Sequence, residues 1–149
     1  MRKFAVAIWA VVLCLSLVGC AQIENIDFPF ELSDVENVEM FHFVDPTDAE
    51  KKVIFKPEDI EDIYTLLESI SLEDKETEPV AGSATTAFRF NLSDGTIYEV
   101  LYSSIAVKSG RIMLTENETD YFTSADIGAN WSKYDYETEK VAEDELPTF

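Results

Sequence analysis

The chain has 149 residues, of which 30 are acidic and 11 are Lys or Arg, so its formal net charge is −19. This length suits one compact domain with a hydrophobic core and is short for two domains. The acidic balance argues against the basic surfaces that hold nucleic acid and against the polybasic segments that clamp proteins to anionic membranes.

The first nineteen residues have the composition of an export signal. Arg2 and Lys3 precede an apolar run from Phe4 to Val18, and a small residue, Gly19, follows that run. This order of a charged start, an apolar run and a small residue is typical of a secretory signal. The run is shorter than the ~20 apolar residues of a transmembrane helix. We therefore expect residues 1–19 to be removed on maturation.

The residue after this run is Cys20, and the motif Leu17-Val18-Gly19-Cys20 resembles the lipobox of bacterial lipoproteins. The resemblance covers about residues 1–21 and does not extend to the rest of the chain. It implies that Cys20 receives a diacylglycerol on its sulfur and becomes the new N-terminus. It also implies a location at the cell membrane, on the extracytoplasmic side. The alternative is an ordinary signal peptide that releases a soluble protein, with Cys20 as a plain thiol.

Maturation would change the cysteine inventory and the charge. Cys14 lies in the apolar run and would leave with it, while Cys20 would be lipidated, so no pair remains for an internal disulfide. Removal of Arg2 and Lys3 would take the formal charge from −19 to −21. Two acyl chains give a stable membrane anchor where one gives reversible binding. We expect residues 20–25 to form the lipidated cysteine and a short tether.

The first elements after the tether are predicted to be strands. Apolar residues at every second position from Ile26 to Leu32 have the period of a half-buried strand, and Pro29 restricts it to a sheet edge. A firmer strand is predicted over 35–44, with apolar groups on both faces. A turn at 45–48 and a short strand over 51–55 follow.

The clearest helix is predicted over 57–72. Pro57 suits the first turn, and Glu58 and Asp59 favour the positive end of the helix dipole. Apolar residues spaced three and four apart form one stripe that should pack on a sheet: Ile60, Ile63, Leu67 and Ile70. The charged segment 73–79 is predicted to be a solvated loop.

Residues 85–102 have the pattern of a β-hairpin that turns at Ser93-Asp94-Gly95. Two registers compete. A two-residue turn sets Phe90 opposite Glu99, whereas a three-residue loop with a left-handed Gly95 sets Phe90 opposite Tyr98 and Arg89 opposite Glu99. The second register gives aromatic and opposite-charge pairs and is preferred. A second hairpin is predicted from strands 105–107 and 112–114 joined by 108–111.

The end of the chain is predicted to hold a second helix near 124–134 and an acidic tail. Ile127, Trp131 and Tyr134 have helical spacing, although Gly128 weakens the prediction. Residues 136–149 hold five acidic residues against one lysine and are predicted to be mobile. The sequence thus predicts one α+β domain over 26–135. In it, a small antiparallel sheet of two hairpins and one or two N-terminal strands packs against the main helix.

No motif for catalysis or for a cofactor is recognisable. His42 is the only histidine, and neither a nucleophile motif nor an orienting acid accompanies it. One histidine without a free cysteine argues against zinc. The acidic runs, including 58–62 and 73–78, lack the Asp-x-Asp-x-Asp-Gly spacing of a calcium loop and are interpreted as solvated faces. We expect no metal site.

These observations favour a non-catalytic binding or accessory lipoprotein of the cell envelope. Its partner would be another envelope protein or a cationic ligand drawn to the acidic surface. The aromatic candidates for a recognition surface are Tyr102, Trp131, Tyr134 and Tyr136, for which core packing is the alternative. Two other functions stay open. One is a small envelope hydrolase that uses paired carboxylates, and the other is an inhibitor or immunity-type protein for a cationic partner.

Overall fold

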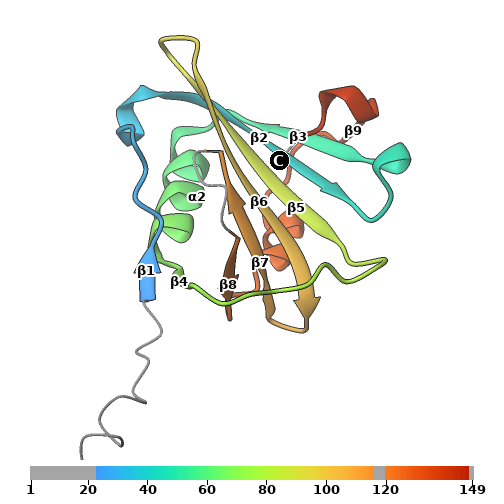
Figure 1. Cartoon of the computed structure of the whole chain (residues 1–149). Helices are drawn as coiled ribbons and strands as arrows, with labels where there is room; N and C mark the ends of the chain where they lie inside the picture. Colours follow the sequence, from blue (N-terminus) through green and yellow to red (C-terminus); the bar gives the residue numbers. More distant parts are fainter. Residues whose placement is uncertain (1–22, 116–119, 148–149) are drawn as a thin grey trace, which may run out of the picture.

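The computed structural model describes residues 23–115 and 120–147. Within these residues, nine strands form one antiparallel sheet in the order β1-β4-β8-β7-β6-β5-β2-β3-β9 (Figure 1). The strands are β1 (Ile23–Asn25), β2 (Val35–Phe43), β3 (Glu50–Ile54), β4 (Ser71–Glu73), β5 (Thr85–Leu92), β6 (Ile97–Ala106), β7 (Ser109–Leu114), β8 (Tyr121–Thr123) and β9 (Glu139–Lys140). The broad α+β class is confirmed, and the sheet has more strands than predicted.

In the part of the chain that the structure describes, the helical segments are one α-helix and four short 3-10 turns. They are α2 (Pro57–Ser69), η1 (Leu32–Asp34), η2 (Pro46–Asp48), η3 (Gly128–Ser132) and η4 (Glu143–Glu145). The main helix begins at Pro57 as predicted, with Glu58 and Asp59 in its first turn. It ends at Ser69, before the predicted end at residue 72, because Ile70 is extended and Ser71 begins β4. The apolar stripe, Ile70 included, is buried. The stripe therefore packs this helix on the sheet.

The β5–β6 hairpin has the preferred register. Phe90 lies opposite Tyr98, and Arg89 lies opposite Glu99. Gly95 in the turn has φ +84°, a left-handed conformation that glycine adopts without steric cost. The aromatic and opposite-charge pairs that distinguish the two registers are thus the pairs that form.

The second hairpin turns earlier than predicted. Ala106 lies opposite Ser109, so the turn is made by Val107 and Lys108, and Gly110 belongs to β7. A Cβ at Gly110 would overlap the ring of Tyr102 and would lie 2.8 Å from the carbonyl oxygen of Ser103. This glycine allows close packing inside the sheet and does not serve the turn.

The N-terminal segment departs from the prediction in two places. Residues 26–31 form no strand, so the predicted edge strand is wrong, yet Ile26, Phe28 and Phe30 are buried in the core. The ring centroids of Phe28 and Phe90 lie 5.3 Å apart. In addition, Ile23–Asn25 pair with β4 as strand β1, where a tether was expected. The alternating apolar residues of 26–30 are thus buried by an irregular segment that packs on the core, and not by a strand.

The predicted helix near 124–134 is only the 3-10 turn η3. Lys52 of β3 is buried, and its Nζ donates to the carbonyl oxygens of Trp131, at 3.0 Å, and Tyr134, at 2.9 Å. Inside the segment, the backbone N and the side-chain Nδ2 of Asn130 both donate to Ile127 O at 3.1 Å, an i−3 pattern in place of the i−4 pattern of an α-helix. Lys52, 79 residues from Trp131 in sequence, fastens the end of this segment to β3.

The described part of the predicted acidic tail, 136–147, is ordered against the sheet. β9 pairs with β3, and Val141 N donates to Ala49 O at 3.2 Å. Lys140 forms ion pairs with Asp48 and Glu50, and Leu146 is buried. The expectation of mobility overlooked one lysine and one leucine that hold this segment. Thr148 and Phe149 lie outside the described residues, as do residues 1–22 with Cys20.

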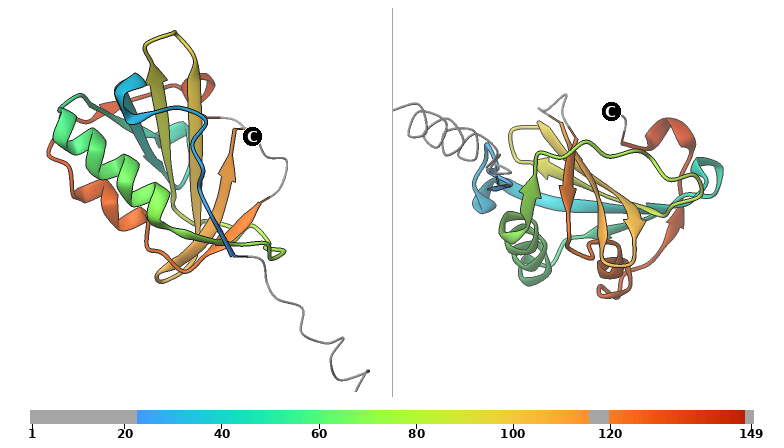
Figure 2. Two further views of the ribbon diagram at one scale, coloured as in Figure 1. Left: turned by 90° about the vertical axis from the view of Figure 1, so that its left-hand side faces the viewer. Right: turned by 60° about the horizontal axis from the view of Figure 1, so that its bottom comes forward.

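The two faces of the sheet are covered unequally. Figure 2 shows α2 and η3 on one face, where the larger core cluster lies. The opposite face, called here the open face, carries a smaller cluster around Phe41, Ala87 and Leu101. Leu146 joins this cluster from the segment 139–147, which is called here the C-terminal segment. The open face is therefore the less covered side of the sheet.

Candidate functional site

The open face carries an apolar row that crosses four strands. Residues directly opposite one another in antiparallel strands present their side chains on the same face. The register sets Phe41 of β2 beside Ala87 of β5, Ala87 beside Leu101 of β6, and Leu101 beside Met113 of β7. The first three are buried, whereas Met113 is only half-buried. The row therefore ends in a half-buried methionine.

A row of paired charges runs alongside the apolar row. Arg89 Nε donates to Glu99 Oε1 at 2.6 Å, and its Nη1 donates to Glu39 Oε2 at 3.3 Å. Lys51 Nζ donates to the other oxygen of Glu39 at 3.0 Å. Burial by itself raises the pKa of Glu39, but its hydrogen bonds and charge interactions with Lys51 and Arg89 outweigh burial and lower it. The charges of these four side chains are therefore compensated by one another.

A hollow of about 340 Å³ lies between the open face and the C-terminal segment, and it is called here the open-face groove. Its lining combines the end of the apolar row with the next cross-strand row, which runs from Phe43 through Thr85 and Ser103 to Arg111. The C-terminal segment supplies one wall. The lining residues are Phe43, Pro46, Thr85, Leu101, Ser103, Arg111, Met113, Glu143, Leu146 and Pro147. Arg111 is paired with Asp120, so its guanidinium is already engaged.

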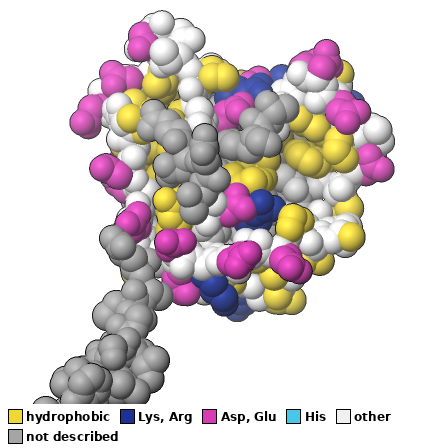
Figure 3. Space-filling model, in the orientation of Figure 1, with side chains coloured by type: hydrophobic (Ala, Val, Ile, Leu, Met, Phe, Trp, Pro, Cys, Tyr) yellow, Lys and Arg dark blue, Asp and Glu magenta, His cyan; other side chains and the backbone are white. Residues whose placement is uncertain are grey.

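The wall of the groove is fixed by several contacts. Arg89 Nη2 donates to Glu145 O at 3.0 Å, and Leu146 packs into the cluster with Phe41 and Leu101. Within the described residues, no hydrogen bond or ion pair engages the carboxylates of Glu143 and Asp144. Figure 3 shows hydrophobic side chains on the open face with acidic side chains around its margin. The groove thus combines an apolar floor with an acidic wall.

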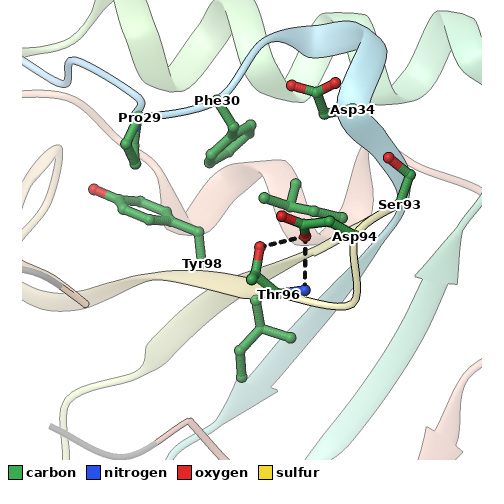
Figure 4. A pocket seen from close by; sticks show the side chains of 9 residues that line it. Pro29, Phe30, Asp34, Ser93, Asp94, Thr96 and Tyr98 are labelled. Carbon is green, nitrogen blue, oxygen red and sulfur yellow. Dashed lines mark hydrogen bonds between the residues drawn. The ribbon is translucent and has the colours of Figure 1, made fainter.

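A second hollow, of about 440 Å³, lies beside the β5–β6 turn and contains two carboxylates, Asp34 and Asp94 (Figure 4). Asp94 Oδ1 accepts hydrogen bonds from Thr96 Oγ1 at 2.6 Å and from Thr96 N at 2.8 Å, and these bonds lower its pKa. Asp34 Oδ2 accepts from Glu31 N at 3.1 Å. A general acid for glycoside hydrolysis needs a raised pKa. The contacts of both aspartates are those of turn-stabilising residues.

His42 faces η3 and takes part in packing. Its ring stacks on Trp131 with 5.3 Å between ring centroids, and Nδ1 lies 3.1 Å from Thr86 Oγ1. Burial lowers the pKa of His42, which favours the neutral ring. Thr86 is 1% exposed, so its hydroxyl is not accessible to a substrate. This pair links the sheet to η3.

The four aromatic candidates do not form one surface patch. Tyr102 and Tyr134 are buried, which removes them as recognition residues. Tyr134 Oη donates to Asp62 at 2.5 Å, and Tyr136 Oη donates to Asp59 at 2.6 Å, so both hydroxyls hold the chain to α2. Trp131 and Tyr136 are half-buried, and Trp131 is covered in part by His42. Their roles in the described structure are in packing.

The groove residues were missed as candidates although one signal pointed to them. The strand prediction over 35–44 noted apolar groups on both faces, and Phe41 and Phe43 are the ones that reach the open face. The contribution of Leu101, Met113 and Leu146 depends on the order of the strands and on the path of the C-terminal segment. Apolar groups on both faces of this strand mean that the open face must also be covered in part, and this was the one sequence signal for the groove.

Among residues 23–115 and 120–147, no group of three or more His, Cys, Asp or Glu side chains is arranged to hold a metal ion. In the same residues, no helix has the length and hydropathy needed to cross a membrane. Comparison of the chain with protein-family models, with curated proteins and with solved structures found no match.

Proposed function

We propose that the protein is a lipid-anchored module on the extracytoplasmic side of the cell membrane that binds a partner protein across its open face without catalysis. The observation that carries the binding role is the open-face groove, an apolar floor that the C-terminal segment covers only in part. The lipobox-like motif ending at Cys20 supports the anchor. The turn-stabilising contacts of Asp34 and Asp94 support a role other than hydrolysis.

The position of the first strand supports a location close to the lipid headgroups. Ile23 begins β1 only three residues after Cys20. A chain spans at most about 3.5 Å per residue, so this connection reaches about 10 Å. The edge strand β1 would therefore sit beside the headgroups, and a partner would be bound near the membrane surface.

The anchor is tested by Cys20→Ala, with Cys14→Ala as the matched control. The first variant should lose the lipid and accumulate as precursor or released protein, whereas the control should fractionate with membranes like the wild type. Mass spectrometry of the N-terminal peptide should find diacylglycerol on Cys20 in the wild type and the control. A processed, membrane-bound Cys20→Ala protein would contradict the anchor.

The binding role is tested by Met113→Lys in the groove, with Thr65→Lys on the exposed side of α2 as the matched control. Both variants add one positive charge at a position that is not buried. Only the groove variant should lose a partner that is crosslinked to the wild-type protein in native membranes. Equal crosslinking by both variants would remove the open face from the proposal.

A further inference from the structure

The chemistry of the open-face groove indicates what kind of segment it receives. We infer that the groove binds an extended segment of a partner protein in which apolar side chains are flanked by Lys or Arg. This inference rests on the proposed function, because it names the chemistry of the partner at the same site.

The floor of the groove calls for apolar side chains. Leu101 and Met113 adjoin each other across β6 and β7, and Phe43 closes one end of the lining. The polar groups of the floor are small or already engaged: the hydroxyls of Ser103 and Ser83 lie 3.1 Å apart, and Arg111 is paired with Asp120. Burial of apolar surface is therefore the main gain available at the floor.

The charges around the groove call for a basic segment. The nearby cations are engaged by carboxylates of this chain, since Arg89 contacts Glu39 and Glu99 and Lys51 contacts Glu39. They offer little to an anionic ligand. Glu143 lines the groove and Asp144 follows it, and within the described residues neither carboxylate has an ion-pair partner. A Lys or Arg beside the apolar side chains would find complementary charge at this wall.

The chain contains its own reporters for this site. It has three methionines, of which Met1 lies in the predicted signal peptide, Met40 is fully buried on the face toward α2, and Met113 lines the groove. In the acylated protein with ¹³C-methyl methionine, held in phosphatidylcholine nanodiscs, a ligand in the groove should move the Met113 signal. The Met40 signal is the internal control.

The probes are two peptides that share an apolar centre, Ac-Lys-Leu-Val-Leu-Lys-NH2 and Ac-Glu-Leu-Val-Leu-Glu-NH2. We expect the basic peptide to shift the Met113 methyl signal saturably, with weaker binding as salt rises. The acidic peptide should bind at least about tenfold more weakly, which corresponds to ~1.4 kcal/mol. Equal shifts with both peptides, or no shift with either, would overturn the inference.

Matched double variants test the acidic wall. Glu143→Gln with Asp144→Asn should weaken the binding of the basic peptide about threefold, because exposed charge pairs contribute ~1 kcal/mol or less. Glu61→Gln with Glu68→Gln on α2 should leave its affinity unchanged. If the two pairs have the same effect, the attraction comes from overall charge, and the assignment of the groove fails.

One further variant tests the other possible occupant. Thr148 and Phe149 follow Pro147, which lines the groove. If the basic peptide shifts Met113 only after these two residues are deleted, the occupant is the end of this chain, and the inference is overturned. The proposed function fails independently, through the Cys20→Ala and Met113→Lys tests. Failure of the peptide tests alone would therefore refute only the chemistry assigned to the partner.

Discussion

Arg89 is the residue on which the charged row of the open face depends. It contacts Glu39 and Glu99 through separate nitrogens, and the side chains of all three are less than one-fifth exposed. Arg89→Met would leave Glu99 without its cation and Glu39 with Lys51 alone, and both carboxylates are poorly hydrated. We expect a loss of about 2–3 kcal/mol in the free energy of unfolding, measured by urea denaturation.

The matched control for this prediction is Lys133→Met. Lys133 pairs with Asp62 at 2.5 Å, but both side chains are more than 40% exposed. Loss of this pair should lower the free energy of unfolding by less than about 1 kcal/mol. Equal losses for the two variants would mean that the charged row is as well hydrated as the surface pair.

Glu39 also predicts how stability depends on pH. Its pKa in the folded protein lies below the ordinary value of 4.5, because Lys51 and Arg89 outweigh the effect of burial. A carboxyl group with a lowered folded pKa stabilises the protein above its unfolded pKa, and this contribution is lost as the pH falls through the folded pKa. The stability difference between wild type and Glu39→Gln should therefore be constant above about pH 5 and shrink below about pH 4.5.

The measurement is urea denaturation of both proteins between pH 7 and pH 3. Asp62, whose pKa is lowered by hydrogen bonds from Lys133 and Tyr134, should keep part of the acid sensitivity in the variant. A difference between the proteins that stays constant down to pH 3 would contradict the lowered pKa of Glu39.

At the scale of elements, two glycines that pack against the same tyrosine make a matched pair. A Cβ at Gly110 would overlap the Tyr102 ring, whereas one at Gly128 would lie 3.5 Å from it, an ordinary contact distance. Gly110→Ala should lower the free energy of unfolding by about 1–3 kcal/mol because the β6–β7 pair must shift. Gly128→Ala should change it by less than about 0.5 kcal/mol. Equal effects would mean that the Tyr102 ring can move aside.

Elements with local signals could be predicted from sequence. The register of β5–β6 follows from two adjacent cross-strand pairs, Phe90–Tyr98 and Arg89–Glu99, and from a glycine in the turn, all within eleven residues. The start and the buried stripe of α2 follow likewise from Pro57 and the spacing of four apolar residues. In both places the local preference and the tertiary packing agree.

Elements that depend on distant contacts could not be predicted in this way. The attachment of the η3 segment to the sheet depends on Lys52, and the order of the C-terminal segment depends on Lys140 and Leu146. The groove has the same origin, because its floor comes from four strands and its wall from the last residues of the described chain. Sequence spacing holds no information about which distant side chains will meet there.

For the whole molecule, the arrangement of the sheet relates the proposed anchor to the groove. β1, the strand nearest Cys20, and β9, at the start of the C-terminal segment, are the two edges of the sheet. Eight strand spacings of ~4.8 Å separate these edges, which is about 38 Å for a flat sheet. The groove lies over β2, β5, β6 and β7, between the two edges. An anchored protein could therefore present the open face sideways to a neighbouring envelope protein.

The most direct measurement is site-specific photocrosslinking in intact cells, with the photoreactive residue at position 113 of the full chain and at position 65 as the control. We predict that position 113 yields one crosslinked protein in the membrane fraction, that position 65 does not, and that Cys20→Ala abolishes the product. Crosslinks of equal yield from both positions, or a product that persists without Cys20, would contradict an anchored module that binds its partner across the open face.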